Sequence, residues 1–172
     1  SGRADAIALT ADGVQVWVAQ YGPGHVVGQS GVFSESPLGH EIVTKTPVKY
    51  GALSPTQFRE LMNGQSGFSS YIVEMISRQN RRIKDRLVAM ASLSIRGQIC
   101  AEIYRLAKPV GVSEDVMIIR PAPRFVDIAE RVHTTRETVS RTVHSLINKG
   151  IVAKEPGALL IKNPAKFHFH IK

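Results

Sequence analysis

The clearest hydrophobic pattern in the chain lies between residues 125 and 149, where two short amphipathic helices are predicted. In each of them, apolar positions recur at i, i+3, i+4 and i+7, the spacing that places side chains on one helix face. Polar residues separate the two stretches, so we expect a tight turn between the helices. The apolar faces comprise Phe125, Ile128, Ala129 and Val132 in the first helix, and Val139, Thr142, Val143 and Leu146 in the second.

The turn between these helices falls at His133-Thr134-Thr135. Thr134 is followed three residues later by Glu137. This spacing fits a capping box, in which the threonine oxygen accepts a free backbone N–H and the glutamate reaches back to the start of the helix. We therefore expect the second helix to begin near Thr135.

The polar face of the second helix predicts DNA binding. Two apolar-backed helices joined by a turn of about three or four residues have helix-turn-helix geometry, which places the second helix in the major groove. Arginine pairs with guanine and glutamate accepts from cytosine, so Arg136, Arg141 and Glu137 are expected to read bases. On periodicity alone, a helical hairpin with a solvated charged face fits equally well. The full predicted DNA-binding set is Thr135, Arg136, Glu137, Ser140, Arg141, His144 and Lys154.

The segment TTRETVSRTVHSLINKGIV, within residues 128–152, resembles the Crp/Fnr family of bacterial transcription factors, named for the cyclic-AMP receptor protein and the fumarate-nitrate regulator. The resemblance implies a homodimer that binds an inverted repeat, with Arg136, Glu137 and Arg141 contacting bases. Arg136 matches the cyclic-AMP branch of the family, whereas Ser140 matches the fumarate-nitrate branch. Half-sites of TGTGA or TTGAT type are therefore both open.

Short alternating apolar stretches between residues 6 and 53 predict β-strands with glycine-rich turns between them. Asp12-Gly13 is a signal for a two-residue hairpin. The region resembles the later part of the family's cyclic-nucleotide-binding domain, an antiparallel β-roll in which a Gly-Glu pair precedes a short helix. The resemblance implies that the β-roll is partial here, without its first strands. The expected strands are residues 7–10, 14–18, 26–27, 42–44 and 48–53.

The positions that hold cyclic AMP in the resembled family lack the expected polar groups. Gln29 stands where the family has Glu, Leu38-Gly39 where it has Arg-Ser, and Ile83-Lys84 where it has Thr-Ser. These changes remove the cation and the hydroxyl that would pair with the phosphate. We therefore expect no cyclic-AMP cofactor, although His40 or Lys84 could contact a different anion. The predicted degenerate pocket consists of Gly28, Gln29, Leu38, Gly39, Ile83 and Lys84.

Two helices are predicted between the strands and residue 92. Ser54-Pro55 begins the first, with serine as the N-cap and proline at the first position, and Asn63-Gly64 ends it. The second, over residues 68–91, has an apolar seam. Such a seam is more often core than coiled coil, but the resemblance implies dimerisation through this helix. The predicted interface is Ile72, Ile76, Gln79, Ile83, Leu87 and Met90.

Four features complete the C-terminal part of the chain. They are a hinge at Ser92–Ser94, a helix from Ile95 to Leu106, a short strand over 116–119, and a wing hairpin with strands at 151–153 and 158–161. The final stretch, 167–171, alternates like a strand. Its two histidines are weak candidates for metal ligands because no carboxylate or thiol lies near them, so we expect no metal site.

Composition supports a polyanionic partner, because 22 Lys and Arg against 14 Asp and Glu give a net charge of +8. Cys100 is the only cysteine, which excludes an iron–sulfur cluster held by several thiolates and suits a reducing cytoplasm. No apolar run reaches 18 residues and no export leader is evident, so we expect a soluble, cytoplasmic protein that contacts no membrane.

Together these features predict an α+β fold: a partial antiparallel β-roll over 1–66, a dimerisation helix over 67–92 and a winged helix-turn-helix over 93–172. The expected function is a homodimeric, sequence-specific transcription regulator that binds double-stranded DNA and, through the resemblance, RNA polymerase. An alternative is a ligand-binding or protein-interaction module whose helix-turn-helix is structural. No catalytic motif is present, so an enzyme is not expected.

Overall fold

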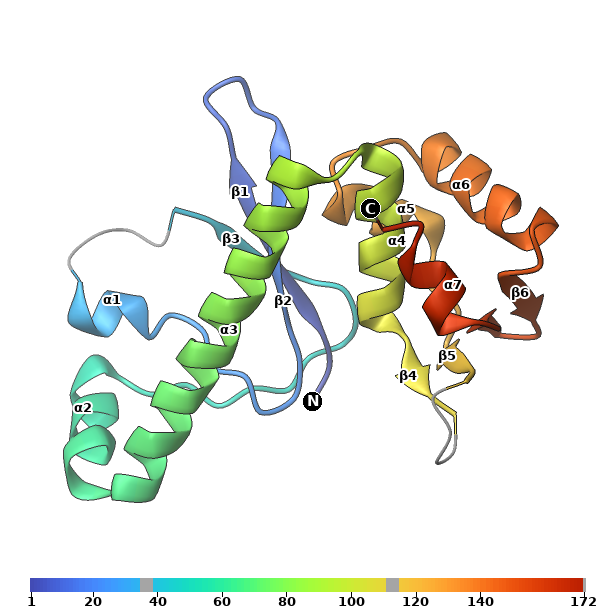
Figure 1. Ribbon diagram of the computed structural model, residues 1–172. Helices are drawn as coiled ribbons and strands as arrows, with labels where there is room; N and C mark the ends of the chain where they lie inside the picture. The colour runs from blue at the N-terminus through green and yellow to red at the C-terminus, as the bar shows by residue number, and fades with distance from the viewer. Residues whose placement is uncertain (35–38, 111–114, 172) are drawn as a thin grey trace. The chain divides into compact units, whose positions relative to one another are not determined.

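The computed structural model describes residues 1–34, 39–110 and 115–171 of the 172-residue chain. The chain divides into two compact units, Ser1–Lys84 and Asp85–Lys172. The long helix α3, Ser66–Ser92, contributes to both (Figure 1). Within the described residues, no helix combines the length and the apolar character that crossing a membrane requires.

The N-terminal unit contains a three-stranded antiparallel sheet in the order β2-β1-β3. Its strands are β1 (Ala4–Leu9), β2 (Gln15–Tyr21) and β3 (Glu41–Thr44). Ala4 lies opposite Tyr21 on one side and Thr44 on the other, which fixes the register. The predicted antiparallel arrangement is confirmed. The strands expected at 26–27 and 48–53 are wrong, because Val26 donates its N–H to the Met75 sulfur at 3.4 Å and the later stretch joins no sheet.

The hairpin between β1 and β2 has a three-residue loop rather than the predicted two-residue turn. Thr10 and Val14 close the loop through an N–H···O bond of 3.0 Å, and the Gly13 N–H donates to the Thr10 carbonyl at 2.9 Å. Gly13 has φ of 78°, the left-handed conformation that three-residue loops place at their last position. The hairpin that Asp12-Gly13 predicted is therefore confirmed, but its loop is one residue longer than predicted.

Three helices accompany this sheet. The short α1 (Ser30–Phe33) follows Gly28-Gln29, where the family resemblance places a helix. The next helix, α2 (Pro55–Gly64), begins as predicted: the Gln57 N–H donates to Ser54 Oγ at 3.2 Å, and the Ser54 N–H to Gln57 Oε1 at 2.9 Å. The α2–α3 region holds a small core of Phe58, Ile72 and Met75.

The C-terminal unit packs the four helices that follow α3 with a four-stranded sheet in the order β4-β5-β7-β6. Ser94 caps α4 (Ile95–Leu106) by accepting the Gly97 N–H at 3.2 Å, so a new helix begins after the break at Leu93; a hinge there stays a prediction. The helix-turn-helix pair follows as α5 (Phe125–Arg131) and α6 (Arg136–Asn148). The strands are β4 (Lys108–Pro109), β5 (Met117–Ile119), β6 (Val152–Glu155) and β7 (Ala158–Ile161).

The C-terminal tail is helical, and the predicted strand over 167–171 is wrong. Asn163 caps α7 (Pro164–His168) by accepting the Lys166 N–H at 2.8 Å, and Pro164 takes the first helical position. This start signal outweighs the alternation of two phenylalanines. Phe167 is fully buried and stacks on Tyr104, with ring centroids 6.1 Å apart, so the tail closes the core of this unit.

Candidate nucleic-acid interface

The turn between α5 and α6 is held by backbone bonds and by one left-handed residue. The Thr134 N–H donates to the Ala129 carbonyl at 3.0 Å, and His133 has φ of 52°. Thr135, not Thr134, caps α6, because its Oγ1 accepts the Thr138 N–H at 3.2 Å. The predicted capping box of Thr134 with Glu137 is therefore wrong, because the Thr134 backbone bonds to a carbonyl of α5 and Thr135 is the N-cap of α6. The predicted start of α6 near Thr135 is confirmed.

The amphipathic pattern of α6 is confirmed. Val139, Val143 and Leu146 are fully buried against the core of the C-terminal unit. Thr142 lies on the same face and satisfies its hydroxyl internally by donating to the Thr138 carbonyl at 2.9 Å. Burial of four residues in one row fixes the helix about its own axis, so the opposite face is presented to solvent at a defined angle.

The opposite face of α6 lines a surface concavity. Among the predicted DNA-binding residues, Arg136, Glu137, Arg141 and His144 are exposed there, and Ser140 is half-buried. Both arginines are therefore free of their own core. The concavity extends beyond the predicted set along the same helical face, to Ser145, Asn148 and Lys149. The i+4 spacing of Ser145 from Arg141 and of Asn148 from His144 is the signal that could have included them.

Contacts along this face are local. His144 Nδ1 lies 2.9 Å from the Ser140 carbonyl oxygen and 3.3 Å from Ser140 Oγ, and Arg141 donates to Thr138 Oγ1 at 3.4 Å. Thr135, at the N-cap, is exposed and faces Thr138 through their hydroxyls at 3.0 Å. These groups can exchange such contacts for a polyanion without leaving a buried polar atom unsatisfied.

The wing is the β6–β7 hairpin around Pro156-Gly157. Lys154 is exposed on β6, with its ammonium nitrogen 5.2 Å from the centre of the Phe125 ring at the start of α5. A cation over an aromatic face is attracted to it. A second concavity lies between α5 and the wing, and three cations border it: Arg124, Arg136 and Lys154. The carboxylate of Glu155 lines it as well.

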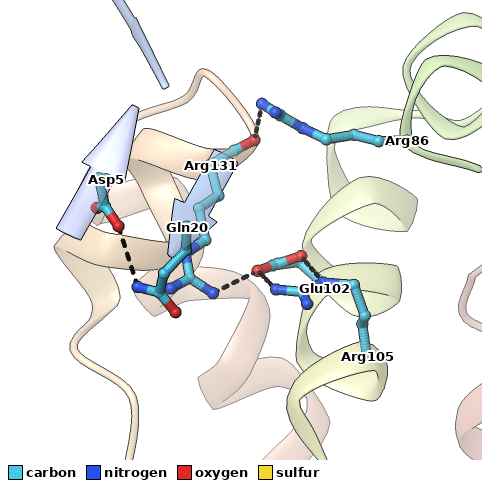
Figure 2. Close-up of polar contacts among 6 residues, drawn as sticks. All are labelled: Asp5, Gln20, Arg86, Glu102, Arg105 and Arg131. Carbon is cyan, nitrogen blue, oxygen red and sulfur yellow. Dashed lines mark hydrogen bonds and ion pairs between the residues drawn. The ribbon is translucent and has the colours of Figure 1, made fainter. Parts of the chain in front are cut away.

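A buried ion-pair network lies beneath the helix-turn-helix, and the sequence did not reveal it (Figure 2). Glu102 on α4 accepts two hydrogen bonds from Arg105, both of 2.7 Å, and one of 2.8 Å from Arg131 on α5. Burial by itself raises the pKa of Glu102, but Arg105 and then Arg131 outweigh it, and the pKa is lowered. The Glu102 carboxylate therefore ties α5 to α4.

Residues 98–168 match the family of Crp-like helix-turn-helix domains. This part of the chain is a Crp-like helix-turn-helix domain. The match covers α5, the turn, α6 and the wing, so the predicted resemblance to the Crp/Fnr family is confirmed.

Similar proteins extend the likeness beyond the Crp-like domain. The CRP-like cAMP-activated global transcriptional regulator of Mycobacterium tuberculosis is 21% identical over 153 residues, which cover 88% of this chain and 68% of that protein. A CooA variant from Carboxydothermus hydrogenoformans has a TM-score of 0.79 at 15% identity and covers all of this chain and 76% of its own. The c-di-GMP responsive regulator CLP of Xanthomonas campestris has a TM-score of 0.70 at 20% identity, covering 94% and 81%. At these identities the solved structures show a shared fold.

The predicted effector positions lie in several elements of the chain. Gly28 and Gly39 have left-handed backbones, with φ of 86° and 64°, and Gln29 is the residue before α1. Ile83 and Lys84 are exposed on α3. Leu38 lies outside the described residues. A degenerate pocket therefore stays a prediction.

Cys100 is fully buried, and burial raises the pKa of its thiol to about 11. No group of three or more His, Cys, Asp or Glu that could hold a metal occurs among residues 1–34, 39–110 and 115–171.

The predicted seam on α3 is only partly available to a partner. Ile72 is 1% exposed, in the core of the N-terminal unit, and Gln79 is half-buried. Other apolar residues of the helix are exposed and, together with Asn80, form one row with alternating spacings of three and four. This row is Val73, Ile76, Asn80, Ile83, Leu87 and Met90.

Proposed function

We propose that this protein acts as a homodimer that recognises a palindromic DNA site, with α6 of each copy in the major groove. The observation that carries the proposal is the two-sided character of α6: one face is fixed in the core, and the other presents Arg136, Glu137 and Arg141 to solvent. Helix-turn-helix proteins use this arrangement to place side chains against base edges.

Base recognition and backbone contact fall to different residues in this proposal. Arg136 and Arg141 donate to guanine, and Glu137 accepts from cytosine. Thr135, Ser140, His144 and Lys154 contact phosphates or flanking bases, which sets the register of the protein on the duplex. The net charge of +8 adds a sequence-independent attraction that weakens with salt.

The exposed row on α3 supports dimerisation. Its spacing of three and four residues is that of a two-stranded coiled coil, in which each helix buries such a row against its partner. Asn80 occupies a position within this row. A polar asparagine at one such position sets the register of the pair at some cost in stability. In this proposal the dimer therefore forms through Val73, Ile76, Ile83, Leu87 and Met90, aligned by Asn80.

The effector domain is proposed to be degenerate towards cyclic AMP. The mycobacterial relative is named as cAMP-activated and CLP as responsive to c-di-GMP, so effectors differ among similar proteins. Here Gln29, Leu38 and Ile83 replace groups that would hold the cyclic nucleotide. We therefore propose regulation without cyclic AMP, with RNA polymerase as the partner at the promoter.

Selection of binding sites from random duplex DNA, with and without cyclic AMP, tests the proposal. We expect an inverted repeat whose half-sites lie about one helical turn apart, or a multiple of it. The same repeat should emerge in both arms. Recovery of no common sequence would contradict base recognition, and a repeat that appears only with cyclic AMP would contradict the degenerate pocket.

A further inference from the structure

The guanidinium of Arg86, near the C-terminal end of α3, contacts both the last residue of α5 and the turn that follows it. Arg86 Nη2 donates to the Arg131 carbonyl at 2.7 Å, the contact drawn in Figure 2. The same nitrogen lies 3.0 Å from Nε2 of His133. Arg131 is the last residue of α5, and His133 is the left-handed residue of the turn. Arg86 therefore contacts the segment that sets the angle between α5 and α6.

The Arg131 carbonyl lies in the last turn of α5, where it has no hydrogen-bond donor from within the helix. Arg131 is also fixed from its other end, because its side chain pairs with Glu102 at 2.8 Å. The end of α5 is thus held by α4 through the side chain and by α3 through the backbone.

The contact with His133 defines the form of the imidazole. Arginine has donors only, so Nε2 must accept, which requires a neutral ring with its proton on Nδ1. Burial and then the charge of Arg86 lower the pKa of His133, in agreement with a neutral ring. The charged groups that act on Arg86 include Glu102, Arg105 and Arg131.

The left-handed backbone at His133 makes the turn depend on its surroundings. A residue with a Cβ rarely adopts positive φ, and such a conformation persists only where neighbouring contacts enforce it. Arg86 contacts both this ring and the backbone carbonyl of Arg131, two residues before it.

We propose that Arg86 is a positioning residue that ties the turn between α5 and α6 to the end of α3. The inference rests on the proposed function, because α3 would form the dimer and α6 would read DNA. With Arg86 in place, the helix that pairs the two copies also sets the direction of each recognition helix. The two copies of α6 can then match half-sites at one fixed separation.

The test compares Arg86→Gln and Arg86→Lys in the full chain with Arg81→Gln. The control removes the same charge from an exposed arginine of α3. The probes are the inverted repeat selected by the unaltered protein, the same repeat with one to three base pairs inserted between its half-sites, and a random duplex. We expect Arg86→Gln to lower affinity for the selected repeat by roughly 3- to 30-fold. Its binding to random duplex and its dimerisation should not change.

Two outcomes separate positioning from general damage to the fold. Arg86→Gln should also lose discrimination between spacings, and Arg86→Lys should restore part of it because the ammonium can still donate to the carbonyl. A loss that is equal on all spacings, or as large in Arg81→Gln, would overturn the proposal.

A measurement without DNA keeps this proposal separate from the proposed function. In ¹⁵N NMR spectra, His133 of the unaltered protein should show the Nδ1-protonated neutral form, and Arg86→Gln should lose that preference. Amide exchange of Thr134 should quicken in the same variant. If neither changes, the tie between Arg86 and the turn is refuted even where DNA recognition stands. If both change and no sequence preference exists, only the proposed function fails.

Discussion

The two units of the chain differ most in how they bury apolar residues. In the C-terminal unit, residues from all three major helices and from β5, β6 and β7 form one continuous core. In the N-terminal unit, the described core around α2 and α3 is limited to Phe58, Ile72 and Met75, and several large apolar side chains are exposed. Outside α3, these exposed residues are Leu9, Val14, Val27, Phe33, Ile42, Val43, Tyr50 and Leu53.

This contrast indicates different roles. In the proposed function α6 meets base edges at a fixed angle, which requires a rigid support, and the continuous core beneath α6 provides one. A unit with little core and much exposed apolar surface is less stable by itself and can be stabilised by binding another surface. We therefore expect the C-terminal unit to be the more stable of the two.

The largest losses of stability are expected from two separate variants, each of which removes the buried carboxylate of one unit. Glu102→Ala takes away the carboxylate that pairs with the buried Arg131 and should cost about 3–5 kcal/mol of unfolding free energy. Asp5 on β1 is also buried, but it accepts from Gln20 at 3.1 Å and its ion partner Lys45 is partly exposed. Asp5→Ala should cost about 1–3 kcal/mol. Urea titrations measure both, and a larger loss for Asp5→Ala would reverse the ranking.

A pair of leucines tests the same contrast in apolar packing. Leu146 of α6 is 0% exposed and Leu9 of β1 is 54% exposed. Leu146→Ala should destabilise the C-terminal unit by about 2–5 kcal/mol, because it leaves a cavity. Leu9→Ala should change stability by about 0.5 kcal/mol or less. Equal losses in denaturant titrations would show that the two units do not differ in packing as described.

The chain contains one natural probe for each unit. Trp17, the only tryptophan, lies in β2, and Cys100, the only cysteine, lies in the core of the C-terminal unit. On titration with urea, Trp17 fluorescence should change before Cys100 becomes open to a thiol reagent. In native buffer, labelling of Cys100 should be slow, because the thiol is buried and its pKa is raised to about 11. Coincident transitions would mean that the units unfold together.

A smaller effect is expected from pH. Burial, followed by nearby arginines, lowers the pKa of His133 in one unit and of His25 in the other. A lowered pKa means that the folded state favours the neutral ring. Its stabilisation is complete above the unfolded value of about 6.5 and is lost as pH falls through the folded pKa. The urea concentration at the midpoint of Cys100 exposure should therefore be lower at about pH 5.5 than at about pH 7.5.

His133→Asn is the matched control for this pH effect. Asparagine tolerates the left-handed backbone and does not titrate. Its midpoint should depend less on pH than that of the unaltered protein, while the Trp17 transition, which reports on the His25 unit, should keep its own dependence. An unchanged pH dependence of Cys100 exposure in this variant would rule out His133 as its source.

Sequence periodicity predicted the helices of the C-terminal unit well because each buries one continuous stripe. The buried face of α6 follows from residue spacing, and in the N-terminal unit the start of α2 follows from the Ser54 cap. Predictions from residue spacing were wrong where a second local signal favoured a different structure. The tail alternates like a strand, but the Asn163-Pro164 helix start decides its conformation.

The candidate site shows the same limit. Sequence placed Arg136, Glu137 and Arg141 on one exposed face, since that depends only on position within a helix. It could not show that Arg131 pairs with Glu102, or that Arg86 reaches the turn, because both depend on how distant segments meet. Nor could it choose between Ile72 and Val73 for the α3 row, since adjacent residues differ only in which face the core covers.

The central claim is that the exposed face of α6 reads base sequence. Its most direct test is the affinity of Arg141→Ala, beside the exposed-arginine control Arg81→Ala, for the selected repeat and for random duplex at one salt concentration. The account predicts that Arg141→Ala loses about 1–3 kcal/mol on the selected repeat and little on random DNA, and that the control loses little on either. An equal loss on both duplexes would show that Arg141 contributes charge alone and would contradict base reading by this face.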